Sequence, residues 1–220
     1  DSAPRPPKST GAVFFPLPTF FCGLSLSPAA RSRRVLAMAV PALLVSAATA
    51  YADGTTAGWG VNASGQLGDA STSNSSVPVA VYTAGVLSGK TLLQFSASSG
   101  SVTHVCAVAS DGAAYCWGNN GNGQLGDPSV STAVSSVPVA VSTASPSALA
   151  GKTITMVAAG GSSTCATTTE GLAYCWGQGT SGQLGNGNFL DSTTAVAVST
   201  SGVLLGKSVT QMSGGNAHFC

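Results

Sequence analysis

The chain has 220 residues, of which 44% are hydrophobic and only 7% are charged, against about 25% charged residues in an ordinary soluble domain. This length and apolar content suffice for one large domain or two small ones with a buried core. From residue 53 onward the chain has six acidic residues and only three lysines. Binding to nucleic acid requires clustered Lys and Arg, so this region is a poor candidate for direct contact with nucleic acid.

Residues 31–52 have the three parts of a signal peptide. Arg31, Arg33 and Arg34 precede an apolar run from Val35 to Ala50, and small residues at positions 50 and 52 suit cleavage after Ala52. The run is shorter than the roughly 20 residues that a membrane span needs, and a signal anchor is the alternative. We therefore expect a secreted or extracellular mature chain without a membrane span.

Residues 1–30 form an unassigned leader that is rich in Pro and Ser. The chain begins at Asp1 and its first methionine is Met38, so the start does not resemble a natural translation start. Two interpretations stay open. The leader is either an organellar transit region ahead of a second signal, which would direct the protein to an organelle lumen, or translated upstream sequence.

An internal repeat occupies the rest of the chain. A Trp-Gly motif recurs at intervals of 58 and 59 residues, and each copy is followed by Gly-Gln-Leu-Gly, an apolar strand and a Gly-Lys-Thr/Ser turn. The motif begins at Trp59, Trp117 and Trp176, the Gly-Gln-Leu-Gly segments are 65–68, 123–126 and 182–185, and the strands are 77–81, 137–141 and 195–198. Such a period predicts stacked structural repeats.

A β-hairpin is expected just before the Trp-Gly motif in the second and third copies of the repeat. The segment from Cys106 to Trp117 has Asp111-Gly112 between two apolar runs, and the segment from Cys165 to Trp176 has Glu170-Gly171 at the same place. Asp-Gly between apolar runs is a strong hairpin signal. Each period thus holds about four short antiparallel strands, which is the content of one propeller blade, and helices are not expected after residue 55.

The residues then carry a family resemblance. Asp111-Gly112, Tyr115-Cys116-Trp117-Gly118 and Gly123-Gln124-Leu125-Gly126 together resemble the repeat of the regulator-of-chromosome-condensation family. The resemblance covers roughly residues 56–220 and implies a seven-bladed propeller with four strands per blade. We expect an all-β, incomplete propeller over residues 53–220, with about three of seven blades and the remaining blades in further sequence. The residues expected to fill the space between blades are Trp59, Trp117, Trp176, Leu67, Leu125 and Leu184.

Four cysteines stand in two pairs with equal spacing. Cys106 and Cys116, and likewise Cys165 and Cys175, are ten residues apart across one hairpin. Cross-strand neighbours can lie within disulfide reach, and export would permit oxidation. We favour two disulfides within hairpins; buried free thiols and a metal site are the alternatives, although the spacings are unlike those of structural zinc.

No catalytic constellation, cofactor site or metal site is predicted. The Gly-rich loop 121–126 superficially matches a dinucleotide-binding pattern, but Gly121 is replaced by Ala63 and Thr180 in the other copies. The Gly-Lys-Thr/Ser segments resemble the end of a phosphate-binding loop, but all three copies lack the earlier glycine that this loop requires. Most acids stand beside Gly, as turn-forming residues do. Asn62 and Asn74 fit the acceptor pattern for N-glycosylation.

We expect a secreted or lumenal, non-catalytic scaffold that binds a protein partner of unknown identity. The resemblance also implies two alternatives: the ectodomain of a receptor Ser/Thr kinase, as in crinkly-type plant receptors, and a guanine-nucleotide exchange factor for a small GTPase such as Ran. A β-lactamase inhibitor that uses the same propeller would need aromatic residues on its loops, and the loops here are mostly Ser, Thr, Gly and Asn.

Overall fold

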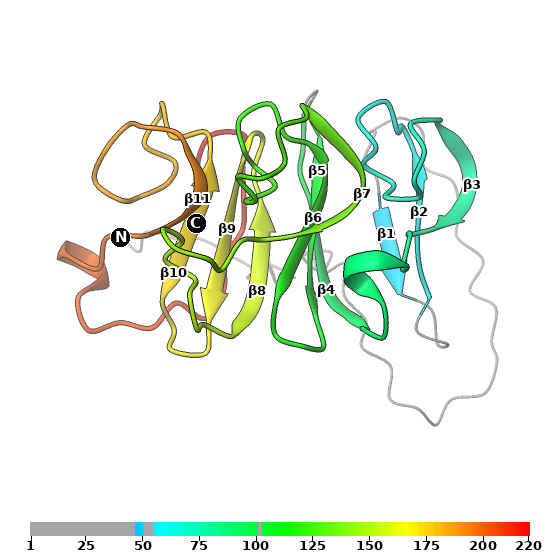
Figure 1. Ribbon diagram of the computed structural model, residues 1–220. Helices are drawn as coiled ribbons and strands as arrows, with labels where there is room; N and C mark the ends of the chain where they lie inside the picture. Colours follow the sequence, from blue (N-terminus) through cyan, green and yellow to red (C-terminus); the bar gives the residue numbers. More distant parts are fainter. Residues whose placement is uncertain (1–46, 51–54, 101–102) are drawn as a thin grey trace, which may run out of the picture.

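The computed structural model describes residues 47–50, 55–100 and 103–220, and of residues 47–50 it describes only the backbone. The strands form three separate antiparallel sheets, which we call blades 1, 2 and 3 (Figure 1). Blade 1 contains β1 (Ala47–Ala50), β2 (Thr56–Gly60) and β3 (Ser75–Ala80). Blade 2 contains β4 (Leu92–Ala97), β5 (His104–Ala109), β6 (Ala114–Asn119) and β7 (Val134–Ala140). Blade 3 contains β8 (Ile154–Ala159), β9 (Ser163–Thr168), β10 (Ala173–Gly177) and β11 (Ser192–Ala197).

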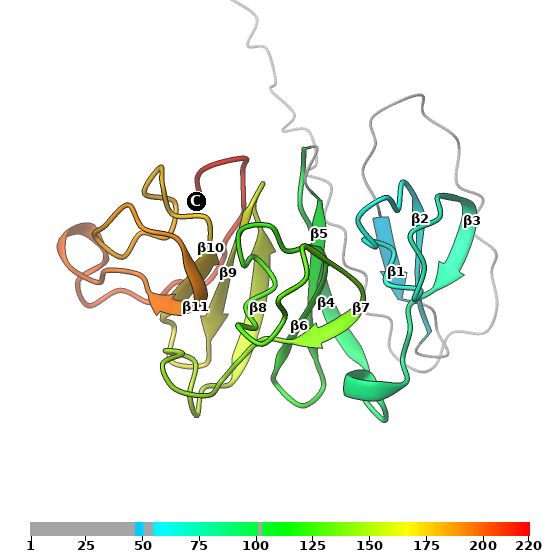
Figure 2. The ribbon, with the colours of Figure 1, turned by 45° about the horizontal axis from the view of Figure 1, so that its top comes forward.

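The blades follow one another in chain order, side by side, as both ribbon views show (Figures 1 and 2). Within each blade consecutive strands are neighbours, so the sheet is a simple meander. The innermost strands of blades 2 and 3, β4 and β8, lie against each other. This arrangement confirms the all-β propeller expected from the repeat.

Two single turns of 3-10 helix differ from the expected strands and loops: η1 (Gly85–Leu87) and η2 (Gly202–Leu204). Each follows the outermost strand of its blade. Leu87 of η1 is buried, as is Leu149 at the corresponding point after blade 2. Within the described part of the chain, no helix is long and apolar enough to cross a membrane.

The hairpins form at the predicted turns. The amide of Gly112 donates to the carbonyl of Ala109 (2.9 Å), and Gly112 has a φ of 74°, in the left-handed region that favours glycine. The Asp111 carboxylate accepts from the amide of Ala113, which fixes the turn. The resulting register places Cys106 opposite Cys116.

The core lies between the blades as well as within them. One buried cluster joins Val81 and Leu87 of blade 1 to Trp117 of blade 2, and a second joins Leu125 of blade 2 to Trp176 of blade 3. Burying an indole of about 150–250 Å² stabilises by roughly 4–6 kcal/mol at most. Each blade therefore depends on its neighbour for a large part of its stability.

Side chains also connect the inner strands of neighbouring blades. The Gln94 side chain of β4 accepts from the amide of Val157 (2.8 Å) and donates to its carbonyl (3.0 Å). The amide of Ala159 donates to the Ser96 hydroxyl (2.9 Å). Hence β4 pairs with β8 through side chains, without a backbone ladder between the two sheets.

Strand β1 lies within the segment that the sequence assigns to a signal peptide. It pairs with β2 in the register Ala47↔Trp59, the same offset along the chain as Val105↔Trp117 in blade 2 and Thr164↔Trp176 in blade 3. The backbone of β1 thus takes the place that β5 and β9 have in their blades. Residues 1–46 and 51–52 of the expected leader and signal lie outside the described residues.

Candidate protein-interaction surface

The repeated Trp of one blade fits against the Gly-Gln-Leu-Gly segment of the blade before it. The indole Nε1 of Trp117 donates to the carbonyl of Gln66 (3.0 Å), and that of Trp176 donates to the carbonyl of Gln124 (2.9 Å). A Cβ added at Gly126 would lie 2.6 Å from Trp176 Nε1. Only glycine leaves room for the indole, which explains why the two motifs recur together.

Of the other residues expected between blades, Leu125 packs with Trp176 of the next blade, whereas Leu184 packs within blade 3 and against Met212 and Phe219. Leu67, Leu125 and Leu184 are buried, and so are Trp117 and Trp176. Trp59 differs, because it is only half-buried.

The structure pairs the same cysteines that the spacing suggests. Cys106 and Cys116 form one disulfide, with 4.1 Å between their Cα atoms, and Cys165 and Cys175 form another, with 4.0 Å. Both Cα separations lie well within the roughly 7 Å beyond which a bridge cannot form. The remaining cysteine of the described part, Cys220, is free and exposed.

The structure argues against glycosylation at Asn62 in the folded chain. Asn62 is fully buried, its side-chain amide donates to Asp69 and Ser71, and its Oδ1 accepts from the amide of Leu67 (2.8 Å). A glycan on this nitrogen would break the loop that presents Leu67. Asn74 is exposed, and its glycosylation stays a prediction.

A buried histidine that the sequence analysis does not use stands between blades 2 and 3. His104 Nε2 lies 2.8 Å from the Thr164 hydroxyl, which itself donates to the carbonyl of Gln124 (2.8 Å). The imidazole therefore donates through Nε2, and Nδ1 is left without a partner. Complete burial lowers the pKa of His104 to about 3. Its role is to fill the space between blades in the neutral form.

Small charge networks lie at the hairpin turns. The Tyr115 hydroxyl donates to Asp111 (2.6 Å), and Lys90 lies 3.7 Å from the same carboxylate and 5.2 Å from the centre of the Tyr115 ring. Burial and then the Asp111 hydrogen bond raise the pKa of Tyr115. Partial burial opposes a lower pKa for Asp111, but the hydrogen bonds from Tyr115 and Ala113 and the charge of Lys90 outweigh it. These networks tie the turn to the blade.

The equivalent turn of blade 3 is more exposed. The Thr168 hydroxyl donates to Glu170 (2.7 Å), and Lys152 lies 3.4 Å from the same carboxylate. The Thr168 hydrogen bond, with the nearby Lys152, lowers the pKa of Glu170. Both carboxylates thus hold their turns in the ionised form.

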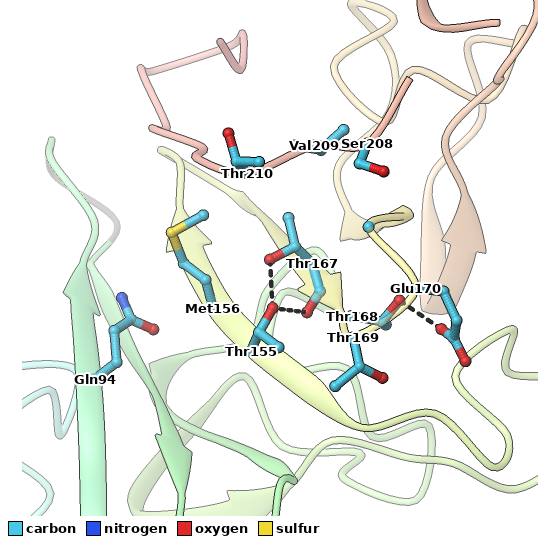
Figure 3. A pocket seen from close by; sticks show the side chains of 11 residues that line it. Gln94, Thr155, Met156, Thr167, Thr168, Thr169, Glu170, Ser208, Val209 and Thr210 are labelled. Carbon is cyan, nitrogen blue, oxygen red and sulfur yellow. Dashed lines mark hydrogen bonds between the residues drawn. The ribbon is translucent and has the colours of Figure 1, made fainter. Parts of the chain in front are cut away.

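An open hollow of about 490 Å³ lies between the inner strands and this turn (Figure 3). Gln94 and Met156 stand on neighbouring blades at one side, Thr210 lies across the hollow, and Glu170 stands at the edge. The Thr155 hydroxyl lies 3.0 Å from that of Thr167. The lining is mainly hydroxyl and methyl groups, and the described residues hold no group of three His, Cys, Asp or Glu side chains that could ligate a metal.

One loop of blade 3 does carry an aromatic residue. Phe189 and Leu190, between β10 and β11, are 68% and 70% exposed. The carboxylate of Asp191 accepts from the amide of Gly179 (2.7 Å), so the base of this loop is held by the blade. An exposed aromatic and aliphatic pair on a rigid base is typical of protein contact sites. The signal was visible in the sequence as the single Phe-Leu pair among polar loop residues.

The pattern of the regulator of chromosome condensation (RCC1) repeat matches residues 111–167 and 170–220, and a second pattern of the same repeat matches residues 96–124 and 154–183. The chain belongs to the RCC1-repeat family. The family expected from the Trp-Gly and Gly-Gln-Leu-Gly motifs is thereby confirmed.

Two plant proteins are similar to this RCC1-repeat chain in sequence. It is 34% identical over 144 residues to the Ultraviolet-B receptor UVR8 of Arabidopsis thaliana. It is 31% identical over 157 residues to RUG3, a mitochondrial RCC1 domain-containing protein of the same plant. The alignments cover 66% and 69% of this chain but only 30% and 32% of those proteins. The chain thus spans about a third of the length of these relatives.

Solved structures agree on the fold. Human WBSCR16 is 26% identical with a TM-score of 0.56, over 68% of this chain and 34% of that one. Prp20p of Saccharomyces cerevisiae, whose structure was described with its binding to Gsp1p and histones, is 18% identical with a TM-score of 0.64, over 78% and 40%. At that identity the likeness to Prp20p shows the fold alone.

Proposed function

We propose that this RCC1-repeat chain is a non-catalytic scaffold that binds a protein partner through the loops of its blades, in a secreted or lumenal location. The observation that carries the proposal is the exposed Phe189–Leu190 pair on a loop whose base is fixed to blade 3. Aromatic side chains offer much contact area at a low cost in conformational entropy. A blade braced by its neighbour and by the Cys165–Cys175 disulfide would present them with little reorganisation.

The cysteine pairs support the location. Both hairpins place two sulfur atoms within bonding distance, and such bonds persist in the oxidising compartments of the secretory route. Thiol alkylation before denaturation, followed by peptide mapping of the natural protein, tests this part. Free thiols at all four positions would contradict a secreted or lumenal location.

The binding proposal is tested by placing a photo-crosslinking amino acid at position 189 and, as a control, at Leu93, which is 63% exposed on β4. We expect one defined protein adduct from position 189 and none of the same mass from position 93. Replacing both Phe189 and Leu190 by Ser should then weaken binding of the identified partner by about tenfold or more, whereas Leu93→Ser should not. Equal binding by the two variants would refute the proposal.

The exchange-factor alternative predicts a different result. A nucleotide exchange factor would accelerate release of labelled GDP from a small GTPase, whether or not a stable complex accumulates. We expect no acceleration beyond that given by a heat-denatured sample. Acceleration that the Phe189 and Leu190 substitutions abolish would replace the scaffold proposal by exchange activity.

A further inference from the structure

Two adjoining hollows lie at the hairpin end of the blades, beside the innermost strands. The first hollow, of about 400 Å³, lies between blades 2 and 3. The second hollow is that of about 490 Å³ between blade 3 and segment 208–210 (Figure 3). Each is lined by the first strand and the hairpin turn of one blade and by the start of the next repeat, and Gln94 and Thr155 line both. The hollow is thus a repeated feature of the junction between blades.

The wall that the next repeat supplies is attached in the same way in both hollows. The amide of Ile154 donates to the carbonyl of Gly112 (2.8 Å) in the first, and the amide of Val209 donates to the carbonyl of Gly171 (2.8 Å) in the second. The first hollow is open although all four strands of blade 3 are in place. A complete blade after segment 208–210 would therefore leave the second hollow open as well, so its opening does not come from the end of the sequence.

The two hollows differ in the chemistry of their walls. Three apolar residues of the first are replaced by threonine at the corresponding positions of the second; the pairs are Leu93 and Thr155, Val108 and Thr167, and Ala109 and Thr168. In all, six of the eleven residues that line the second hollow carry a hydroxyl group. A hydroxyl both donates and accepts hydrogen bonds, so this wall suits a ligand that does the same.

Half of these hydroxyl groups are free for a ligand. The Thr155 and Thr167 hydroxyls lie 3.0 Å apart and bond to each other, and the Thr168 hydroxyl donates to Glu170. The remaining three have no hydrogen-bond partner within the described part of the chain: those of Thr169, Ser208 and Thr210. Solvent satisfies them in the unliganded protein, and the hydroxyl groups of a ligand can take the place of that water.

The charges at the second hollow indicate a neutral ligand. Glu170 is the one charged side chain among the lining residues, and Lys152 lies 3.4 Å from its carboxylate and compensates it. A charged ligand would therefore find no uncompensated partner. A wholly apolar ligand does not fit either, because it would cover the free hydroxyls without hydrogen bonds. Met156 and Val209 add apolar groups to the same wall, and these suit the C–H groups of a ligand.

We propose that the second hollow binds a neutral carbohydrate, whose hydroxyl groups bond with the free hydroxyls of the wall and whose C–H groups lie against Met156 and Val209. Its volume lies within the range of small-molecule sites, about 300–1,000 Å³. The inference goes beyond the proposed binding of a protein through the Phe189 loop. The hairpin turn at Glu170 and that loop are at opposite ends of β10, so the two sites can be tested separately.

The first test is saturation-transfer NMR on the full 220-residue chain with four neutral sugars: maltose, cellobiose, lactose and N,N′-diacetylchitobiose. We expect at least one of them to bind with a dissociation constant of about 1 mM or lower. Glucuronic acid and glucosamine, which are charged, and a capped Ser-Thr-Ser-Thr peptide, which has hydroxyl groups without a sugar ring, should bind at least tenfold more weakly. Binding of none of the four neutral sugars, or tighter binding of the peptide or of a charged sugar, would overturn the proposal.

Variants then place the sugar in the second hollow. Thr169→Val and Thr210→Val each remove one hydroxyl at nearly constant shape and should raise the dissociation constant about fivefold. Thr155→Leu introduces the residue that the first hollow has at this position and should abolish measurable binding.

The matched control is Thr153→Val in the first hollow, at the position that corresponds to Ser208, and it should leave sugar binding unchanged. Replacing Phe189 and Leu190 by Ser should also leave it unchanged, even if the protein-binding proposal fails. Sugar binding that survives all three substitutions in the second hollow, or that is lost with Phe189 and Leu190, would overturn the inference. If Thr155→Leu does not fold, the two valine variants decide.

Discussion

Strands β1 and β2 of blade 1 pair in the same register as β5 and β6 of blade 2, but the two blades are held together differently. Blade 2 has a disulfide at the cross-strand position 106–116 and a fully buried indole, and its two faces are covered by blades 1 and 3. Blade 1 has Ala48 opposite Gly58 at the position of the disulfide, and its indole is half-buried. The comparison shows that the meander forms without a cysteine pair. The disulfide and the fully buried indole add to the stability of blade 2.

The largest expected effect on the free energy of unfolding comes from removing the buried tryptophan side chain of blade 2. Trp117→Ala empties a closed space between blades 1 and 2 and should lower the free energy of unfolding by about 3–5 kcal/mol, as large cavities do. Trp59→Ala removes a half-exposed ring and should cost less than half as much. Chemical denaturation at a concentration where the chain is monomeric measures both, and equal losses would mean that blade 1 is covered as well as blade 2.

The next largest expected effect on stability concerns the disulfide between Cys106 and Cys116. Replacing Cys106 and Cys116 by Ala should lower the free energy of unfolding by about 2–3 kcal/mol, because the unfolded chain regains the freedom of a short loop. Conversely, Ala48→Cys with Gly58→Cys should form a third disulfide under oxidising conditions, since the two positions are paired in the register of β1 and β2. A Cβ at Gly58 lies 3.2 Å from the Leu67 side chain, which is tight but flexible.

The added cysteine pair also tests the N-terminal segment. Cleavage after Ala52 would remove position 48 with β1, and no disulfide to position 58 could then form in the mature chain. N-terminal sequencing of the natural protein gives the same answer independently. A mature chain that starts at Asp53 would mean that blade 1 functions without β1.

A structural feature could be predicted from the sequence where it depends on residues close together in the chain. The cysteine pairs, Trp117 and Trp176 follow from spacings within single hairpins, and the structure pairs or buries them as expected. Leu67, Leu125 and Leu184 are all buried, but Leu184 packs within blade 3 and not between two blades. Burial of Asn62 is not readable from its Asn-x-Ser pattern, because it depends on the loop folding back to Asp69 and Ser71. Strand β1 was not expected, because four small residues in an apolar run are equally typical of a signal peptide.

A smaller effect compares two glycines with similar backbone conformations. Gly126 and Gly151 have φ values of 75° and 69°. A Cβ added at Gly126 would clash with the Trp176 indole, whereas a Cβ added at Gly151 would have no other atom within 4 Å. Gly151→Ala should cost only the left-handed strain, about 1–2 kcal/mol. Gly126→Ala should cost about 2 kcal/mol more, because the indole must move. Similar thermal midpoints for the two variants would contradict the close contact between Gly126 and the Trp176 indole.

The smallest expected effect is a pH dependence of the free energy of unfolding that arises from blade 2 and not from blade 3. His104 of blade 2 stays neutral to a pKa of about 3, while the same imidazole in the unfolded chain takes up a proton near pH 6.5. The unfolded state therefore binds more protons between these values, so this contribution to stability is complete above pH 6.5 and decreases as the pH falls toward 3. We expect a loss of about 2 kcal/mol from pH 6.5 to pH 5.

Blade 3 supplies the control for this pH dependence, because it has Ser163 at the equivalent position. His104→Ser should reduce stability at pH 7 but remove most of its change between pH 6.5 and pH 5. Denaturation midpoints at the two pH values measure the difference. An unchanged pH dependence would show that His104 is not the group that titrates.

The side-chain pairing between β4 and β8 has a consequence for aggregation. Strand β8 is the edge of its sheet, and a bare edge offers its amides to any other strand that approaches. The outward amides of Val157 and Ala159 are already bound by Gln94 and Ser96 of the neighbouring blade. Blade 2 thus shields the edge strand of blade 3 from fibril-like pairing, and separation of the two blades would expose these amides to other strands.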